Sequence, residues 1–312
     1  MNQLLILSND ADEYAEKLRC RNLPDLEIFT ASHSDQAQQF ASHANIILGT
    51  PALIAPLLHR APNLQWVQSS FAGVEPFCAP ELRRDYLLTG VKGIFGPLMS
   101  EYVFAYILAF ERNLFATRKN QCEKRWHSIP YRSLGSLTIG ICGLGSIGQH
   151  IAKTAAHFNM TVLGLSRSAK QIVGVEKVFP PEVICDLSQQ VDYLVSALPN
   201  TSETQGIIND EVFKALGPSA VFINVGRGAT VDEPALIDAL HRKVIRGAVL
   251  DVFQTEPLPQ DNPLWCLDSA FVTPHNSAVT FPADITELFF ENYKRFQAGQ
   301  RLQHVIDFSR EY

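Results

Sequence analysis

The chain has 312 residues, of which 46% are hydrophobic and 19% are charged, and its formal net charge at pH 7 is −6. This composition excludes a disordered chain, because enough apolar side chains are present to form sizeable cores. The acidic balance argues against a nucleic-acid-binding protein, whose affinity for phosphates needs a basic surface. At roughly 100–200 residues per domain, we expect two domains.

Neither a membrane span nor a secretion signal is predicted. The longest purely apolar run, residues 102–110, is far shorter than the roughly 20 residues of a membrane helix, so it predicts a buried helix. The short apolar stretch at 4–7 follows no basic residue and predicts a first strand. The six cysteines form neither a CxxC pair nor a zinc-binding pattern, which is typical of a reducing compartment. We therefore expect a cytoplasmic protein without a metal site.

Strand-like and helix-like segments alternate in the first part of the chain. The apolar runs that predict strands are 4–8, 26–30, 46–49, 64–69 and 86–91. The helices predicted between them are 12–19, 34–43 and 51–59. Such alternation is typical of parallel strands joined by helical crossovers. It predicts a small, doubly wound, flavodoxin-like domain with a five-stranded sheet.

A helix and a polar segment follow this region. Ser100 is predicted to cap a helix that begins at Glu101 and ends at Ala109. The segment 111–133 is rich in Arg and Lys and contains Trp126. It predicts a solvated helix followed by an arm, and an anion-binding site is the alternative.

A second alternating region begins at residue 137. Its predicted strands are 137–142, 161–165, 192–198, 220–225, 247–252 and 270–273. Its predicted helices include 146–158 and 232–242, the second capped by Asp232. Six strands are typical of a dinucleotide-binding sheet.

The last predicted helix, 282–298, has its apolar residues on one face and is expected to return to the first region. The fold class is therefore α/β with two doubly wound parallel-sheet domains. We predict a discontinuous substrate domain of residues 1–98 and 283–312, and a dinucleotide-binding Rossmann domain of residues 99–282.

A glycine-rich turn follows the first strand of the second region. Residues 143–148 read GLGSIG, between the predicted strand at 137–142 and the body of the predicted helix at 146–158. Such a turn lets a pyrophosphate approach the backbone and meet the N–H groups at the helix N terminus. Because strand, turn and helix stand in this order, with a further strand about 20 residues on, the context predicts dinucleotide binding. A glycine-rich turn without a ligand is the alternative.

The residues after the next strand decide which dinucleotide is preferred. An Asp or Glu there would bind the 2′-hydroxyl of the adenosine ribose. The sequence has Ser166, Arg167 and Ser168 instead, and a guanidinium beside hydroxyl groups suits a 2′-phosphate. We therefore predict NADP(H), with NAD(H) possible if Arg167 is an ordinary surface residue.

Arg227, Glu256 and His275 each stand just after one of the last three predicted strands. In open α/β sheets, ligands bind at the carboxyl edge of the strands, so we expect these side chains to converge on one crevice. Singly, each has an ordinary alternative: a phosphate contact for Arg227, a turn residue for Glu256 and a surface residue for His275.

Together, these motifs resemble those of the D-isomer-specific 2-hydroxyacid dehydrogenases. The matching segments are GLGSIG at 143–148, NVGRG at 224–228, DVF at 251–253 followed by EP at 256–257, and TPHNS at 273–277. QSSFAGV at 68–74 is similar to the substrate loop of the family, so the resemblance covers nearly the whole chain. SRS at 166–168 is similar to the glyoxylate/hydroxypyruvate reductase branch, whose members use NADPH. One departure is ALPNT at 197–201, where family members often carry a His.

The resemblance implies catalytic roles for three residues. Arg227 would hold the carboxylate and carbonyl oxygens of the substrate, because a guanidinium is always charged and binds two oxygens at once. His275 would protonate the ketone oxygen as hydride arrives at carbon. Glu256 would hydrogen-bond the imidazole, orient it and favour its protonated form.

The resemblance also implies binding residues. Backbone N–H groups of Ala72, Gly73 and Val74 would receive the substrate carboxylate, and Asp251 would face the nicotinamide carboxamide side. The residues implied at the cofactor are Gly143, Leu144, Gly145, Ser146, Ile147, Gly148, Ser166, Arg167, Ser168, Leu198, Pro199, Thr204, Val225, Gly226, Asp251 and Ser277. Four apolar residues either line the substrate pocket or belong to the core: Phe71, Leu98, Met99 and Trp265.

We therefore expect an NADPH-dependent oxidoreductase that reduces small 2-oxo acids to D-2-hydroxy acids and forms a homodimer. A non-catalytic, dinucleotide-sensing protein is the alternative, because some corepressor proteins resemble the same family. The presence of Arg227, Glu256 and His275 together favours the enzyme.

Overall fold

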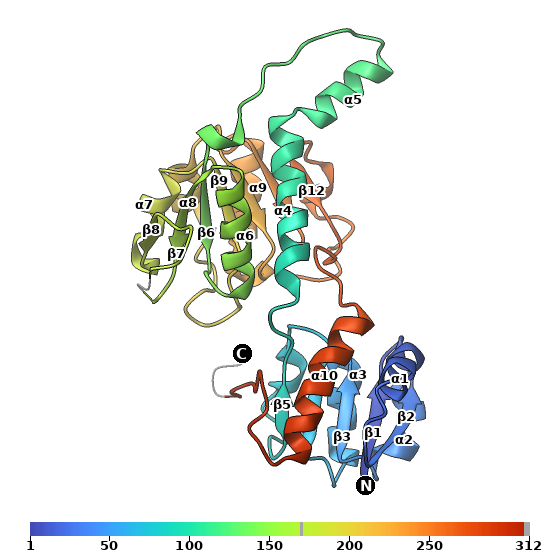
Figure 1. The fold of residues 1–312 in the computed structure, drawn as a ribbon. Helices are drawn as coiled ribbons and strands as arrows, with labels where there is room; N and C mark the ends of the chain where they lie inside the picture. Colours follow the sequence, from blue (N-terminus) through green and yellow to red (C-terminus); the bar gives the residue numbers. More distant parts are fainter. Residues whose placement is uncertain (169–170, 309–312) are drawn as a thin grey trace. The chain divides into compact units, whose positions relative to one another are not determined.

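The computed structural model describes residues 1–168 and 171–308 (Figure 1). The chain divides into two compact units, Met1–Ile94 with Thr280–Tyr312, and Phe95–Val279. The predicted domain boundaries, after residues 98 and 282, each lie a few residues C-terminal to the boundaries of these two units. That the first unit binds the substrate and the second binds the dinucleotide stays a prediction.

The first unit is built on a parallel sheet with the strand order β2-β1-β3-β4-β5, which is flavodoxin-like as predicted. Its strands are β1 (Asn2–Leu7), β2 (Leu26–Ala31), β3 (Ile46–Gly49), β4 (Trp66–Ser69) and β5 (Leu87–Thr89). Its helices are α1 (Ala11–Arg19), α2 (Ser34–Ala41), α3 (Pro51–Ile54) and α10 (Pro282–Gln297). The predicted helix at 51–59 is in fact α3 followed by a short 3-10 helix, Ala55–Arg60.

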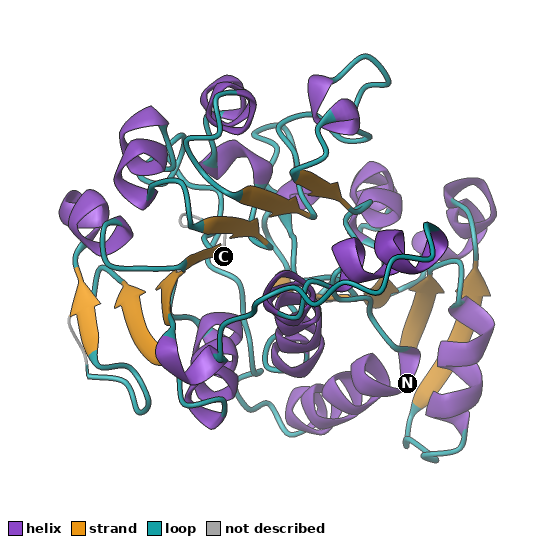
Figure 2. Cartoon of the chain, turned by 90° about the horizontal axis from the view of Figure 1, so that it is seen from above, coloured by secondary structure: helices purple, strands orange, loops and turns teal. Residues whose placement is uncertain are grey.

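Helices cover both faces of this sheet, as Figure 2 shows, and its strands are accordingly apolar on both faces. Successive side chains of a strand point to opposite faces. Val67 packs in one cluster with Ala37 of α2, whereas its neighbour Trp66 stacks on Phe289 of α10, with ring centroids 4.9 Å apart. The buried indole Nε1 of Trp66 donates a hydrogen bond to Thr89 Oγ1 at 2.8 Å. The C-terminal helix thus completes the core of the first unit.

The second unit contains a seven-stranded parallel sheet with the order β12-β11-β10-β9-β6-β7-β8. Its strands are β6 (Thr138–Cys142), β7 (Thr161–Leu165), β8 (Lys177–Phe179), β9 (Tyr193–Ser196), β10 (Val221–Asn224), β11 (Gly247–Leu250) and β12 (Ala270–Val272). The prediction of six strands is wrong by one, because β8 has three residues, begins at an exposed lysine and leaves no apolar run in the sequence. The order reverses at β6, between β7 and β9, which is the switch point of a Rossmann sheet.

The helices of the second unit are α4 (Phe95–Glu111), α5 (Leu114–Cys122), α6 (Ser146–His157), α7 (Ile184–Ser188), α8 (Asp210–Leu216) and α9 (Glu233–His241). Asp232 caps α9 as predicted, with its side chain accepting from the Ala235 N–H at 3.1 Å. The predicted cap at Ser100 is wrong. α4 begins at Phe95, because Pro97 is tolerated in a first helical turn, and the Ser100 hydroxyl instead hydrogen-bonds His150 Nδ1 at 2.7 Å.

The seven-stranded sheet is also buried on both faces. Tyr193 and Val195 of β9 pack in one cluster with Ile107 of α4, whereas Leu194 packs in the other with Phe213 of α8. A strand buried on both sides reads as a continuous apolar run, which is why β9 and its neighbours were visible in the sequence.

The polar segment after α4 forms α5, which has no buried side chain, so the prediction of a solvated helix is confirmed. The chain then returns to the body of the unit near residue 132. Trp126 and Tyr131 are exposed along this arm, and Arg112 lies over the Tyr131 ring at 4.3 Å.

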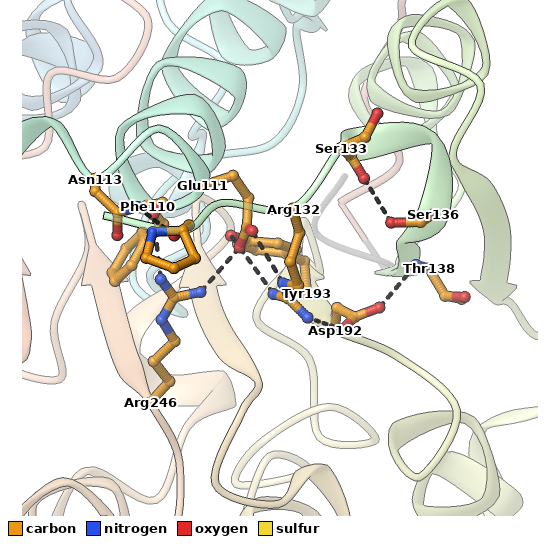
Figure 3. Close-up of polar contacts among 11 residues, drawn as sticks. Phe110, Glu111, Asn113, Arg132, Ser133, Ser136, Thr138, Asp192, Tyr193 and Arg246 are labelled. Atoms are coloured by element: carbon orange, nitrogen blue, oxygen red, sulfur yellow. Dashed lines mark hydrogen bonds and ion pairs between the residues drawn. The ribbon is translucent and has the colours of Figure 1, made fainter. Parts of the chain in front are cut away.

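A buried carboxylate anchors the end of the arm (Figure 3). Glu111, 3% exposed, accepts two hydrogen bonds from Arg132, one from Arg246 at 2.8 Å and one from Tyr193 at 2.6 Å. Arg132 also pairs with Asp192 at 2.6 Å. Burial pushes the pKa of Glu111 upward, but the hydrogen bonds from Arg132 and Tyr193 outweigh it and hold the pKa below its ordinary value. Carboxylates thus already occupy the guanidinium of Arg132, while the anion-site alternative for the other basic residues of 111–133 stays untested.

Within the described residues, no helix combines the length and the apolar character that crossing a membrane requires.

Candidate active site

The turn after β6 has the geometry of a phosphate cradle. Gly143 has φ +96°, a conformation that favours glycine, and a Cβ at Gly148 would lie 1.9 Å from the Gly143 carbonyl oxygen. Around Gly145, by contrast, the space that a Cβ would enter is open. α6 begins directly afterwards at Ser146, its first turn has no acidic residue, and no described side chain caps it. The N-terminal N–H groups of α6 are therefore available to an anion, which fits a pyrophosphate.

Two neighbouring loops approach this turn. The Leu198 side chain, after β9, lies 3.4 Å from the position of a Cβ at Gly143. A Cβ at Gly226, after β10, would lie 2.6 Å from the Leu198 carbonyl oxygen. Thr204 Oγ1 donates to the Pro199 carbonyl at 2.6 Å and so fixes the loop itself. The structure thus brings together predicted cofactor residues from three separate loops, although the contact of each with a cofactor stays a prediction.

The residues predicted to determine the preference for NADP(H) over NAD(H) lie at the end of β7. Ser166 Oγ accepts from the Ser168 N–H at 3.2 Å and lies 3.3 Å from the Ser168 hydroxyl. Arg167 forms an ion pair with Glu203, with Nη1 and Oε2 2.6 Å apart. Glu203 was not predicted from the sequence. No motif in the sequence marks it, because the ion pair joins two loops whose residues are 36 positions apart.

His275 and Glu256 form the hydrogen-bonded pair that the resemblance implied. His275 Nδ1 lies 2.7 Å from Glu256 Oε2, while Glu256 Oε1 accepts from the Phe253 N–H at 2.9 Å. The carboxylate is thus held at both oxygens. The His275 side chain is 50% exposed, and the described part of the chain offers no hydrogen-bond partner to its Nε2. That nitrogen is therefore open to a ligand.

Asp251 fixes the backbone that carries His275. Its buried carboxylate accepts hydrogen bonds from the Thr273 hydroxyl at 2.6 Å, the Asn276 N–H at 2.9 Å and the Ser277 N–H at 3.0 Å. The His275 N–H donates to the Asp251 carbonyl at 3.0 Å, and His275 itself has φ +50°. From the sequence, Asp251 was predicted only to contact the cofactor; the structure shows that it also shapes the loop that carries the imidazole.

A tyrosine supports the same loop from α4. The Tyr102 hydroxyl lies 2.7 Å from Thr273 Oγ1, and Ser277 Oγ lies 3.3 Å from Met99 Sδ. Burial raises the pKa of Tyr102, so this hydroxyl stays protonated and neutral. Contacts from α4 therefore reach both flanks of the His275 loop.

Arg227 follows β10, Glu256 follows β11 and His275 follows β12. These strands are adjacent and parallel, so the three side chains belong to the same carboxyl edge of the sheet. Arg227 is partly buried, and its Nη1 donates to the Gly226 carbonyl at 2.9 Å. The sheet can thus present a guanidinium, an imidazole and a carboxylate at the edge that also carries the phosphate cradle.

The predicted substrate loop lies in the first unit, directly after β4. Ser69 Oγ accepts from the Phe71 N–H at 3.0 Å and donates to the Phe71 carbonyl at 2.7 Å, which fixes a tight turn. Ala72 is exposed and Val74 is buried. The contact of Ala72, Gly73 and Val74 with a substrate stays a prediction. Phe71 and Trp265 are 48% and 52% exposed, so the interpretation of these two as core residues is wrong.

A Rossmann sheet with a phosphate cradle and a histidine–carboxylate pair at one edge defines a dinucleotide-dependent oxidoreductase. Residues 104–277 match the family described as D-isomer specific 2-hydroxyacid dehydrogenase, NAD binding domain. The chain belongs to this family of NAD(P)-dependent enzymes.

Several proteins are similar to the chain over most of its length. Glyoxylate/hydroxypyruvate reductase A of Serratia proteamaculans is 36% identical over 240 residues, which is 77% of this chain and 75% of that protein. The crystal structure of a D-isomer specific 2-hydroxyacid dehydrogenase family protein from Aeromonas salmonicida has 44% identity and a TM-score of 0.95, covering 98% of this chain and 99% of that one.

A second similar structure contains a cofactor. The NADPH-dependent glyoxylate/hydroxypyruvate reductase of Sinorhizobium meliloti, in complex with NADP and sulfate, has 28% identity, a TM-score of 0.89 and complete coverage of both chains.

Proposed function

We propose that the protein is an NADPH-dependent reductase of small 2-oxo acids similar to glyoxylate and hydroxypyruvate, with D-2-hydroxy acids as products. The observation that carries the proposal is the 2.7 Å contact between His275 Nδ1 and Glu256 Oε2 at the sheet edge that also bears the GLGSIG turn. The names of the reductases from Serratia proteamaculans and Sinorhizobium meliloti support the same substrate class.

The proposed cofactor residues suit NADPH in charge and in shape. The turn at 143–148 and the N terminus of α6 would hold the pyrophosphate, while Ser166, Arg167 and Ser168 would hold the 2′-phosphate. When bound, the nicotinamide supplies the hydride that reduces the ketone carbon. The further contacts that we assign to the cofactor come from Leu198, Pro199, Thr204, Val225, Gly226, Asp251 and Ser277.

His275 is proposed as the general acid. With Nδ1 bound to Glu256, the other ring nitrogen, Nε2, faces the substrate and transfers its proton to the ketone oxygen. Glu256 accepts the hydrogen bond from Nδ1 and so fixes the orientation of the ring. The hydrogen bond from the Phe253 N–H keeps the carboxylate from rotating away.

Arg227 is proposed to bind and polarise the substrate. A guanidinium donates two parallel hydrogen bonds to adjacent oxygens, which suits the carboxylate and the ketone of a 2-oxo acid. Its charge also stabilises the oxygen as negative charge develops there. The backbone N–H groups of Ala72, Gly73 and Val74 are proposed as further donors to the carboxylate.

The experiment that tests the proposal follows the loss of NADPH absorbance with purified protein and a panel of glyoxylate, hydroxypyruvate and phenylpyruvate. We expect turnover with at least one of these acids, and a higher kcat/KM with NADPH than with NADH. Arg167→Ala should reduce that preference. Tight NADPH binding without turnover of any 2-oxo acid would favour a dinucleotide sensor, and a preference for NADH would contradict the cofactor assignment.

The assembly and location belong to the same proposal. We infer a homodimer in the cytoplasm, supported by exposed apolar side chains on α5 and the arm, among them Leu114, Phe115 and Trp126, and by the scattered cysteines, which form no CxxC pair in the sequence. Light scattering tests the dimer: a mass near 35 kDa instead of about twice the 34.7 kDa of one chain would contradict it.

A further inference from the structure

An acidic side chain already occupies the arginine that we assign to the 2′-phosphate. Arg167 Nη1 and Glu203 Oε2 are 2.6 Å apart, and the two side chains are 59% and 63% exposed. The residues come from different loops, Arg167 from the end of β7 and Glu203 from the loop after β9. A 2′-phosphate bound by Arg167 must therefore approach a guanidinium that has a carboxylate beside it.

The loop that carries Glu203 is held by its own hydrogen bonds. Thr204 Oγ1 accepts from the Thr201 N–H at 2.9 Å and donates to the Pro199 carbonyl at 2.6 Å. The backbone N–H groups of Thr204 and Gln205 both donate to the Thr201 carbonyl. The backbone on both sides of Glu203 is thus fixed, so its carboxylate is presented toward the end of β7 by a defined turn.

We propose that Glu203 is a specificity-determining residue that lowers the preference for NADPH over NADH by competing with the 2′-phosphate for Arg167. This inference rests on the proposed assignment of Arg167 to that phosphate. A phosphate monoester carries a charge of about −1.5 to −2 near neutral pH, so it either displaces the Glu203 carboxylate or lies close to it. Both outcomes weaken binding of the phosphorylated cofactor. NADH has no 2′-phosphate, so the ion pair between Arg167 and Glu203 stays intact when NADH binds, and NADH binding is not weakened.

The expected effect is modest because the pair is exposed. Exposed ion pairs contribute little individually and are screened by salt, so Glu203→Gln should strengthen binding of the phosphorylated ligand by about two- to tenfold at low ionic strength. Glutamine keeps the size and the hydrogen-bonding oxygen of the side chain while it removes the charge. The comparison therefore isolates the charge of Glu203.

The test uses two cofactor fragments that differ by one phosphate, 2′,5′-ADP and 5′-AMP, with affinities measured by titration calorimetry on the full chain. Glu203→Gln should strengthen 2′,5′-ADP binding by two- to tenfold, leave 5′-AMP binding within about 1.5-fold, and lose its effect in 0.5 M salt. In an Arg167→Ala background the same substitution should change 2′,5′-ADP affinity much less. The ratio of kcat/KM for NADPH to that for NADH should rise in parallel.

Asp238→Asn is the matched control. It removes an exposed carboxylate of α9 from its pair with Arg242, which follows that helix; the two side chains are 54% and 62% exposed, and the substitution should change neither affinity. An equal effect of Glu203→Gln on both fragments, or none on 2′,5′-ADP, overturns the inference and leaves the proposed function standing. If the unaltered protein binds 2′,5′-ADP no better than 5′-AMP, the assignment of Arg167 fails, and the inference fails with it.

Discussion

Two carboxylates of the second unit have basic partners but very different surroundings. Glu111 is 3% exposed and binds Arg132, Arg246 and Tyr193 (Figure 3). Glu256 is 35% exposed and binds His275, whose side chain is 50% exposed. The first carboxylate joins segments far apart in the sequence, whereas the second lies in a loop at the ligand-binding edge of the sheet.

The difference shows how burial decides what a charged pair can do. Arg132, Arg246 and Tyr193 all donate to Glu111, and both guanidinium groups also donate to a second protein oxygen, so the cluster can stabilise the fold but has little capacity left for a ligand. The Glu256–His275 pair uses one ring nitrogen and leaves the other open, so it can hold a proton where a substrate would arrive. Substitutions at the two sites should therefore separate stability from catalysis.

The largest effect is expected at the exposed pair. His275→Ala should lower kcat for 2-oxo acid reduction by about 10²–10⁴, because it removes the general acid. It should change the urea unfolding midpoint little, since the side chain is half exposed. His241→Ala, at an exposed position in α9, is the control and should keep full activity. Near-complete activity of His275→Ala would refute the catalytic role.

The second-largest effect is expected for the buried carboxylate of Glu111, and it concerns the stability of the fold only. Glu111→Gln should reduce the free energy of unfolding by about 2–4 kcal/mol, because two guanidinium groups lose their charged partner. This loss is smaller than for an ion pair with both partners fully buried, because Arg132 and Arg246 are 38% and 32% exposed and can turn toward water. Urea denaturation measures this change. A loss below about 0.5 kcal/mol, typical of a surface position, would show that the cluster does not anchor the arm.

The same carboxylate predicts a pH dependence. Burial alone would raise the pKa of Glu111, but the bonds from Arg132 and Tyr193 lower it below the unfolded value of about 4.3. Its contribution to stability is therefore complete above that pH and is lost as the pH falls through the lower, folded value. As the pH falls below the unfolded value, the unaltered protein should lose stability more steeply than Glu111→Gln. Parallel unfolding curves would contradict this assignment.

A smaller catalytic effect is expected at Glu256. Glu256→Gln keeps a hydrogen-bonding oxygen but replaces the carboxylate that holds His275 Nδ1 by a weaker, neutral acceptor, so kcat should fall by about 10- to 100-fold, a part of the full contribution of the acid. Steady-state kinetics with saturating NADPH measures it. Unchanged kcat would mean that the 2.7 Å contact has no catalytic consequence.

The smallest effect is expected for a fully solvated pair. Asp238→Asn, which breaks the 2.9 Å contact with Arg242, should change the free energy of unfolding by less than about 0.5 kcal/mol and leave kcat unaltered. Urea denaturation and kinetics check both. A larger loss of stability would contradict the rule that burial sets the strength of these pairs.

Much of the fold could be predicted because most strands are buried on both faces and read as apolar runs. β3 and β7 begin and end where the sequence predicted. β8 was missed because three residues that begin with an exposed lysine give no periodicity. The start of α4 was misplaced because Ser100 looks like a cap, whereas its hydroxyl is used in a contact with His150, fifty residues away.

The site was predictable only in part. The order of Arg227, Glu256 and His275 after successive strands indicated a shared edge, because parallel strands end on the same side of a sheet. The backbone donors that hold Asp251 and the pairing of Arg167 with Glu203 were not predictable, since they depend on how separate loops fold toward one another. For the same reason, the partner of Arg246, 135 positions earlier in the chain, left no pattern in the sequence.

The central claim is that Glu256 acts on the reaction through His275. The most direct measurement is a double-mutant cycle in kcat with the unaltered protein, His275→Ala, Glu256→Gln and the double variant. If the carboxylate works only through the imidazole, the double variant should be as slow as His275→Ala alone, within about twofold. If the two losses instead multiply, the residues act independently and the account of the pair is contradicted.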